Sequence, residues 1–279
     1  MTSVLITGAS GQLGRELVCA FADLDVIATD VDQIDVCNRQ ETLSAIASLR
    51  PDIVVHAAAV TDVDGCEATP DLAFAVNALG TRNIAAAART VGAYVVYVST
   101  DYVFDGTKAT AYDEWDTPNP LSVYGRSKLG GEHELDAGSA IVRTSWLFGV
   151  GGANVVKTVL RLAAAPGEIR FVDDQHGCPT SAADLASAVR RLAGDRMPGT
   201  FHVTNQGATT WWQFARDIVT AAGGDPGRVQ PISTQELGRP APRPANSVLE
   251  NAAMRLAGMP LLPDHREALE RVVTELLAR

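Results

Sequence analysis

The sequence of 279 residues predicts an α/β fold, in which a doubly wound parallel sheet is joined to a smaller C-terminal lobe. Three observations support this prediction. Short β-branched apolar runs alternate with longer helical patterns through the first half, a glycine-rich turn follows the first run, and the alternation weakens after Trp146. A chain of this length can bury one large core or two smaller ones.

The first half contains five apolar runs of strand length. Strands are expected at Ser3–Thr7, Asp25–Thr29, Ile53–His56, Tyr94–Ser99 and Ala140–Thr144. Helical patterns lie between them at Gln12–Ala22, Glu41–Leu49, Asp71–Thr90 and Leu121–Leu135. Strands that alternate with helices in this way form right-handed β-α-β units, which place helices on both faces of a parallel sheet.

The second half is less regular. Helices are expected at Asn154–Ala164, Ala182–Ala193, Thr210–Ala222 and Asp264–Leu277, with one strand at Thr200–Val203. We therefore expect residues 1–150 to form the sheet domain and 151–279 to form mainly a smaller lobe over the carboxyl edge of the sheet, with later segments free to return to the first domain.

Composition excludes several classes of function. A net charge of -10 lacks the field that attracts nucleic acid or anionic membranes. No apolar stretch approaches the ~20 residues of a membrane span, and the N-terminus has no basic leader, so we expect a cytoplasmic protein. The scattered cysteines lack metal-ligand spacing and predict buried or half-buried thiols in a reducing compartment: Cys19, Cys37, Cys66 and Cys178.

A glycine turn follows the first predicted strand. Gly8, Gly11 and Gly14 have the spacing G-x-x-G-x-x-G, which allows a tight turn and a close approach of the backbone to a pyrophosphate at a helix N-terminus. Asp30 ends the second strand and can accept hydrogen bonds from an adenosine ribose, or can be a solvated turn carboxylate. Arg15 favours a 2′-phosphate instead, which leaves NADH and NADPH both open.

A catalytic pair is predicted at the start of the helix near residue 124. Tyr124 and Lys128 lie one helical turn apart and share a face. A neighbouring ammonium is expected to lower the pKa of the phenol from ~10 and make it a usable general acid. Thr100, at the end of the fourth strand, can hold a carbonyl oxygen against the phenol. An exposed i,i+4 pair is the alternative, and the ordered coincidence with the glycine turn argues against it.

These features together resemble the short-chain dehydrogenase/reductase superfamily, and within its extended nucleotide-sugar branch the dTDP-4-dehydrorhamnose reductase family. The resemblance covers nearly the whole chain. It is carried by Ser99–Phe104, Val123–Lys128, Arg143–Trp146, Asp174–Thr180, Thr209–Trp211 and Arg243–Ser247. It implies a Rossmann-type, NAD(P)-binding domain over 1–150 and a substrate-binding lobe over 151–279.

The resemblance also implies residue roles. Tyr124 would be the proton donor, Lys128 would hold the nicotinamide ribose and tune the tyrosine, and Thr100 would assist at the sugar carbonyl. Cofactor contacts are implied for Tyr124 and Lys128. They are also implied for Gly8, Gly11, Gln12, Leu13, Asp30, Asp35, Val36, Ala59, Val60 and Thr61. The residues implied to contact the sugar nucleotide are Thr100, Asp101 and Trp146.

Some features depart from the family or carry less weight. His56 stands where the family usually has Asn, as a tolerated variant or a pocket hydrogen-bonder; we favour the tolerated variant. Thr100 stands where the superfamily more often has Ser. Some relatives form homodimers assisted by a divalent cation near the position of Glu16, and a homodimer and such an ion are weaker expectations.

The resulting hypothesis is an NADPH- or NADH-dependent reduction of the 4-keto group of dTDP-4-dehydro-L-rhamnose, a step in cell-surface polysaccharide precursor synthesis. One alternative is a reductase of another dTDP-4-keto-6-deoxysugar. Another is a non-catalytic regulatory subunit on the same fold, against which the presence of Thr100, Tyr124 and Lys128 argues.

Overall fold

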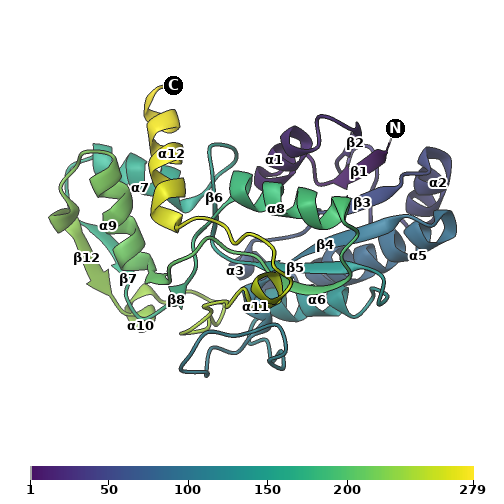
Figure 1. The fold of residues 1–279 in the computed structure, drawn as a ribbon. Helices are drawn as coiled ribbons and strands as arrows, with labels where there is room; N and C mark the ends of the chain where they lie inside the picture. The colour runs from purple at the N-terminus through teal and green to yellow at the C-terminus, as the bar shows by residue number, and fades with distance from the viewer. Residues whose placement is uncertain (1) are drawn as a thin grey trace.

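The computed structural model describes residues 2–279 and is organised around a six-stranded sheet (Figure 1). Its strands are β1 (Ser3–Thr7), β2 (Asp25–Thr29), β3 (Ile53–His56), β4 (Tyr94–Thr100), β5 (Ala140–Thr144) and β10 (Gly199–His202). They lie in the order β10-β5-β4-β3-β1-β2, and every neighbouring pair is parallel. The winding reverses between β1 and β3, which is where sheets of this kind bind ligands. The predicted fold class is confirmed.

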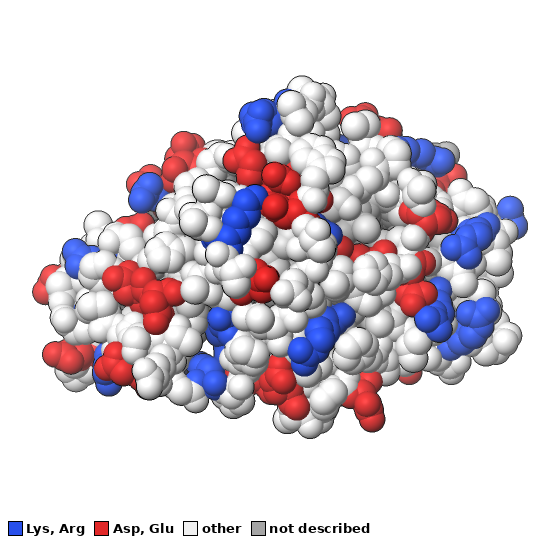
Figure 2. All heavy atoms as spheres, turned by 90° about the horizontal axis from the view of Figure 1, so that it is seen from below, with Lys and Arg blue, Asp and Glu red and all other residues white. Residues whose placement is uncertain are grey.

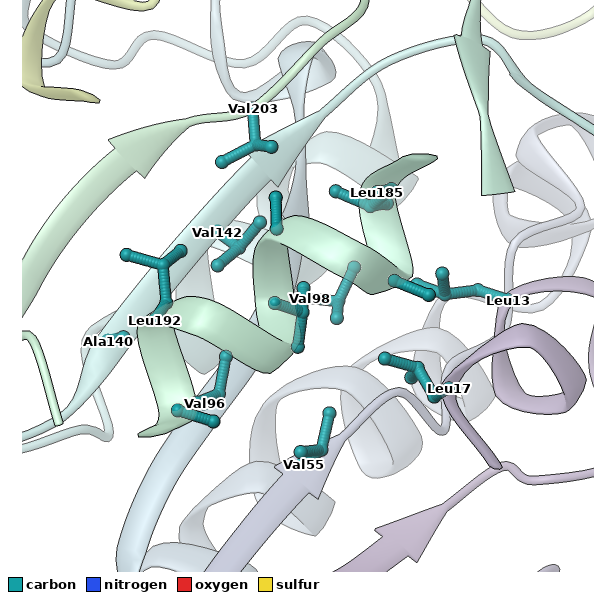
Figure 3. Packing of buried hydrophobic residues seen from close by; sticks show 14 of the residues in the cluster. Leu13, Leu17, Val55, Val96, Val98, Ala140, Val142, Leu185, Leu192 and Val203 are labelled. Atoms are coloured by element: carbon teal, nitrogen blue, oxygen red, sulfur yellow. The ribbon is translucent and has the colours of Figure 1, made fainter. Parts of the chain in front are cut away.

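Helices cover both faces of this sheet. They are α1 (Gln12–Ala20) and α8 (Ala182–Gly194) on one face, and α2 (Arg39–Leu49) and α5 (Thr81–Val91) on the other. Successive side chains of β1 point to opposite faces, so Val4 and Ile6 pack with α1 and α8 while Leu5 packs with α2 and α5. Figure 3 shows the first of these cores, with side chains of α8 and α1 among those of the central strands.

A second body lies beside the sheet, on the left in Figure 1. It consists of α7 (Val155–Ala164), β7 (Ile169–Val172), α9 (Trp211–Ala221), β12 (Val229–Ile232) and α12 (His265–Leu277). Its two strands pair in parallel, and its helices bury a separate apolar core that includes Val159, Phe214 and Leu269. A smaller body with its own core is what the prediction of a C-terminal lobe requires.

The remaining elements are short. They are α3 (Val63–Ala68), α4 (Pro70–Phe74), the π-helix η1 (Ala75–Gly80), the 3-10 helix η2 (Asp101–Val103), α6 (Val123–Glu132), β6 (Leu147–Phe148), β8 (His176–Gly177), β9 (Thr180–Ser181), β11 (Thr209–Thr210), the 3-10 helix η3 (Pro226–Arg228), α10 (Thr234–Leu237) and α11 (Ala252–Leu256). In this region β6 pairs with β9 and β8 pairs with β11.

The structure corrects several sequence predictions. The single helix expected over Asp71–Thr90 is three elements, α4, η1 and α5, because the chain widens into a π-helix between them. The short strands β7 and β12 were not predicted. Cys19 and Cys37 are exposed, so the expectation of buried or half-buried thiols holds only for the other two cysteines. Both β10 and α8 follow residue 150 and belong to the large sheet and its cover, a return of later segments that the sequence prediction allowed for.

The molecular surface carries charges of both signs. On the face shown in Figure 2, acidic and basic side chains are interspersed without a continuous basic area. Within residues 2–279, no helix has the length and apolar character that crossing a bilayer requires.

Candidate active site

A cavity of about 630 Å³ lies at the carboxyl ends of the central strands. It is lined by many of the predicted site residues: Gly8, Gly11, Gln12, Leu13, Ala59, Thr61, Thr100, Asp101, Tyr124, Lys128 and Trp146. A second cavity of about 320 Å³ shares part of this wall and is lined by the remaining predicted residues, Asp30, Asp35, Val36 and Val60. The structure therefore brings every residue that was given a catalytic, cofactor or substrate role into one continuous region.

The glycine turn forms the floor where the two cavities meet. Gly8 has a φ of 70°, and a Cβ there would lie 2.8 Å from the backbone of Ala58. At Gly14 a Cβ would lie 2.1 Å from the carbonyl oxygen of Gly8, so α1 packs directly on the turn. Gly11 is the N-cap of α1 and supplies no side-chain cap, which leaves the first amides of the helix free for an anion. These features fit a dinucleotide pyrophosphate.

A buried donor points to the same ligand. The side-chain amide Nε2 of Gln12 is shielded from solvent and has no hydrogen-bond partner among residues 2–279. Gln12 lines the large cavity beside the turn. Because an unpaired buried donor is costly, this group is suited to a ligand acceptor such as a phosphate oxygen.

Asp30 is held at the edge of the second cavity by backbone amides. Its carboxylate accepts hydrogen bonds from Ser10 N at 3.0 Å and from Val31 N at 2.8 Å. These bonds keep the pKa of Asp30 below its usual value, the bond from Val31 having the largest effect. The side chain of Arg15 donates to the carbonyl oxygen of Ser10 at 3.0 Å, on the same turn. A fixed carboxylate and a nearby guanidinium therefore share this end of the site.

Tyr124 enters the large cavity from the first turn of α6. Ser122 caps this helix by accepting a hydrogen bond from Gly125 N, and a Cβ on Gly125 would lie 2.1 Å from the carbonyl oxygen of Tyr102. That close approach seats α6 against the end of β4. The enclosing walls desolvate the Tyr124 hydroxyl and raise its pKa, while a hydrogen bond with Thr100 acts in the opposite direction. The predicted lowering of this pKa by the Lys128 ammonium is wrong: burial and the charges of Asp101 and Cys66 raise it, and only the hydrogen bond with Thr100 lowers it.

Lys128 is 3% exposed and lies one turn further along α6. Desolvation lowers the pKa of its ammonium to about 7, and the charge of Glu132 opposes this shift. Its Nζ lies 4.1 Å from the centroid of the Tyr97 ring. The ammonium is thus a buried group that loses its charge near neutral pH unless a partner stabilises it.

Thr100 and Asp101 close the cavity at the end of β4. The Thr100 hydroxyl donates to Asp101 Oδ1 at 3.0 Å and accepts from Tyr102 N at 3.2 Å. Burial raises the pKa of Asp101 to about 7, against the effect of hydrogen bonds from Ser247 and Thr100. Oδ2 of Asp101 has no partner among residues 2–279, so it is available to a polar ligand.

An aromatic pair forms another part of the cavity wall. The Trp146 and Trp211 rings stack with centroids 3.6 Å apart and an interplanar angle of 8°. Trp146 has a φ of 48°, a conformation that non-glycine residues rarely adopt. A Cβ on Gly177 would lie 2.4 Å from the Trp146 ring, so this glycine makes room for the indole. Such a platform offers a flat apolar surface to a sugar or a base.

Sequence reasoning missed the polar support beneath the site. The Asn77 side chain, in the π-helix, accepts from Val60 N at 2.9 Å and donates to Val60 O at 3.0 Å and to Ser127 Oγ at 2.9 Å. It therefore joins the loop after β3 to the helix that carries Tyr124 and Lys128. A lone Asn within an expected helix is no signal by itself, because only the π-helix turns it inward.

His56 does not line either cavity. It is completely buried, with Nδ1 2.7 Å from Thr7 Oγ1 and Nε2 3.2 Å from Thr81 Oγ1. Burial is the larger of the two effects that lower its pKa to about 3, so its ring is neutral. His56 is thus a structural link between β1, β3 and α5 and not a pocket hydrogen-bonder.

Within residues 2–279, no group of three or more His, Cys, Asp or Glu side chains is arranged to hold a metal ion. Glu16, at the position where a divalent ion was a weaker expectation, is half-buried on α1.

Comparisons with known proteins agree over the full chain. The family model described as RmlD substrate binding domain matches residues 1–278. A dTDP-4-dehydrorhamnose reductase of Streptomyces griseus is 42% identical, over 99% of this chain and 94% of the relative. "Probable dTDP-4,6-dihydroxy-2-methyloxan-3-one 4-ketoreductase" of Streptomyces antibioticus is 40% identical, over 98% of this chain and 95% of the relative.

A solved structure is equally similar. The dTDP-4-dehydrorhamnose reductase of Bacillus anthracis, in complex with NADP, has a TM-score of 0.95 and 41% identity, over 99% of this chain and 100% of that one. The family model and these relatives each span nearly all of the sequence. The chain therefore belongs to the RmlD substrate-binding-domain family.

Proposed function

We propose that this protein is an NADPH- or NADH-dependent reductase of the 4-keto group of dTDP-4-dehydro-L-rhamnose. The observation that carries the proposal is the convergence of Thr100, Tyr124 and Lys128 in one cavity whose floor is a glycine turn suited to a pyrophosphate. Relatives at about 40% identity bear the corresponding name, and one of them binds NADP in its crystal structure.

Each residue has a role that follows from its position. The glycine turn and Gln12 would hold the cofactor pyrophosphate, and the bound cofactor would supply a hydride to the carbonyl carbon. As the carbonyl π bond breaks, the Tyr124 hydroxyl gives its proton to the developing alkoxide. The Thr100 hydroxyl would redirect its single proton from Asp101 Oδ1 to the same oxygen and align it. The Lys128 ammonium stabilises the tyrosinate that remains, which offsets the high pKa of the buried phenol.

Substrate contacts are assigned to Asp101 and Trp146, which line the same cavity as the catalytic groups. Asp101 presents an unpaired oxygen to the cavity, and Trp146 presents the stacked indole surface. Holding the nucleotide sugar between these walls places its carbonyl beside Tyr124, and this alignment supplies much of the rate enhancement. Cofactor contacts at the adenosine end are assigned to Asp30, Asp35 and Val36.

The same proposal extends to the organisation of the protein. Residues 1–150 would contain most of the cofactor site, and 151–279 would contribute mainly to the substrate side while returning α8 and β10 to the large sheet. A cytoplasmic location and a homodimer accompany the proposal, and light scattering tests the dimer.

Replacing Tyr124 by Phe tests the assigned chemistry. The variant Tyr124→Phe should lower kcat by about 10²- to 10⁴-fold, because the proton donor is lost while the ring remains. NADPH consumption in the presence of the keto sugar measures the rate, and fluorescence titration should show that cofactor binding persists. Tyr112→Phe removes another buried hydroxyl outside the cavity and is the matched control. A Tyr124→Phe enzyme with near-normal turnover would contradict the role.

A second candidate substrate is favoured by one relative. The Streptomyces antibioticus protein is named for a different dTDP-linked keto sugar, at 40% identity over 98% of this chain. The cavity groups described above suit either carbonyl. Parallel assays with both keto sugars, with identification of the products, separate the two candidates.

A further inference from the structure

The aromatic ring of Tyr97 lies beside the catalytic lysine. Tyr97 is on β4, is completely buried, and its ring centroid is 4.1 Å from Lys128 Nζ. The Tyr97 hydroxyl donates to the carbonyl oxygens of Asn77 and Lys128, both at 3.3 Å. These bonds, together with the close approach of Gly131, hold the ring in place beneath α6.

The carboxylate nearest to Lys128 along α6 is already engaged. Glu132 pairs with Arg143, with Nη2 2.7 Å from Oε2, and it also accepts from the Ser99 hydroxyl. Both members of this ion pair are buried. Within residues 2–279, the Lys128 ammonium itself makes no hydrogen bond or ion pair. Glu132 therefore acts on it only at a distance, and the positive charge of Arg143 partly cancels that attraction.

The other titratable neighbours of this ammonium carry no compensating charge at neutral pH. Tyr124, one turn earlier on α6, has a raised pKa and is a neutral phenol. His56, on β3, pairs in register with Tyr97, and their ring centroids are 5.6 Å apart. Its hydrogen bonds to Thr7 and Thr81 and its lowered pKa keep it neutral, which avoids a second cation beside Lys128.

We propose that the ring face of Tyr97 is a positioning element of the active site, which holds the Lys128 ammonium by a cation–π interaction and favours its charged form. The ring quadrupole attracts a cation most strongly when both are shielded from bulk water, and here Tyr97 is completely buried and Lys128 is 3% exposed. The catalytic consequence rests on the proposed function, because a charged Lys128 is what stabilises the tyrosinate of Tyr124. The contact itself does not depend on the identity of the substrate.

The interaction has a measurable effect on one lysine. Loss of a desolvated cation–π contact should lower the pKa of Lys128 by about one unit. The chain has only three lysines, Lys108, Lys128 and Lys157, so protein labelled with ¹³C at the lysine ε-carbon gives few signals. Lys128→Arg assigns the signal of interest by its disappearance, and the other two lysines serve as internal references.

The test is a ¹³C NMR pH titration of the full chain without substrate. In the wild type the Lys128 signal should titrate near pH 7. In Tyr97→Leu its midpoint should fall by about one unit, because the ring face is lost. In Tyr97→Phe, the matched control that loses only the hydroxyl, the midpoint should stay within a few tenths of a unit. An unchanged midpoint in Tyr97→Leu, or an equal fall in both variants, would overturn the proposal.

A graded series covers the case in which Tyr97→Leu does not fold. Phenylalanines with one, two or three ring fluorines at position 97 change the volume little but progressively weaken the ring quadrupole. The Lys128 midpoint should fall stepwise with each fluorine, which a purely packing role would not produce. One common midpoint for the whole series would reject the cation–π contact.

Turnover measurements separate this inference from the proposed function. If the wild type reduces no keto sugar, the proposed function fails while the NMR titration still decides the contact. If it is active, the alkaline limb of kcat/KM should move to lower pH with the Lys128 midpoint, because deprotonation removes the charge opposite the tyrosinate. A limb that stays in place while the midpoint moves would refute the catalytic consequence alone.

Discussion

At the scale of single residues, buried titratable side chains determine how this protein responds to pH. His56 is neutral in the fold with a pKa of about 3, whereas an unfolded histidine binds a proton near pH 6.5. Its contribution to stability is therefore complete above about pH 6.5 and is lost as the pH falls toward 3. His202 behaves in the same way, and Asp101, with its raised pKa, acts in the opposite direction.

Replacing His56 isolates its share of this response. His56→Asn keeps a polar side chain between Thr7 and Thr81 but removes the titration. Between pH 7 and 4.5, the variant should lose about 2 kcal/mol less of its free energy of unfolding than the wild type, because only the wild type has an imidazole at position 56 that binds a proton on unfolding. The contributions of His202 and Asp101 are common to both proteins and cancel in the comparison. Urea denaturation at several pH values measures this difference. The exposed His133→Asn is the control and should follow the wild type, and a parallel pH response in His56→Asn would contradict the assignment.

At the scale of elements, the π-helix η1 couples the loop after β3 to α6. Removing its buried amide with Asn77→Ala should cost about 2–4 kcal/mol, because Val60 and Ser127 lose their partners in a dry interior. It should also lower kcat, since α6 carries Tyr124 and Lys128. Thermal unfolding and steady-state turnover measure the two effects.

A destabilised variant far from the site separates loss of stability from loss of coupling. Gly92 ends α5 with a φ of 73° and has open space around it, so Gly92→Ala strains the backbone by about 1 kcal/mol without touching the site. This control should be less stable but fully active below its unfolding temperature. If Asn77→Ala were destabilised with an unchanged kcat, η1 would be only a structural element.

At the scale of the whole molecule, two segments from the C-terminal half of the sequence complete the sheet formed by the N-terminal half. Helix α8 buries apolar side chains such as Leu185 and Leu192 against α1 and the central strands, and β10 pairs with β5 (Figure 3). A fragment of residues 1–150 would expose that face and the edge of β5. We therefore expect the fragment to show no cooperative unfolding and to bind the apolar dye ANS, unlike the full chain. Cooperative melting of the fragment, with NADH binding, would show that residues 1–150 fold independently.

Much of the architecture was predictable because local patterns carry it. The five strands of the first half match their apolar runs at four sites exactly and at β4 to within one residue, since buried parallel strands need continuous apolar sequence. The glycine turn and the Tyr124/Lys128 spacing are equally local. By contrast, β7 and β12 have only four residues each and are strands because they pair with one another across a long stretch of sequence.

The sequence by itself determined the sheet class, the dinucleotide turn and the identities of the groups in the cavity, because chemistry and periodicity are read from neighbouring residues. Only the tertiary structure decided that Asn77 and His56 support the site from below, that Tyr97 lies against Lys128, and that burial raises the pKa of Tyr124. These depend on which distant segments exclude water from one another, and no local pattern contains that information.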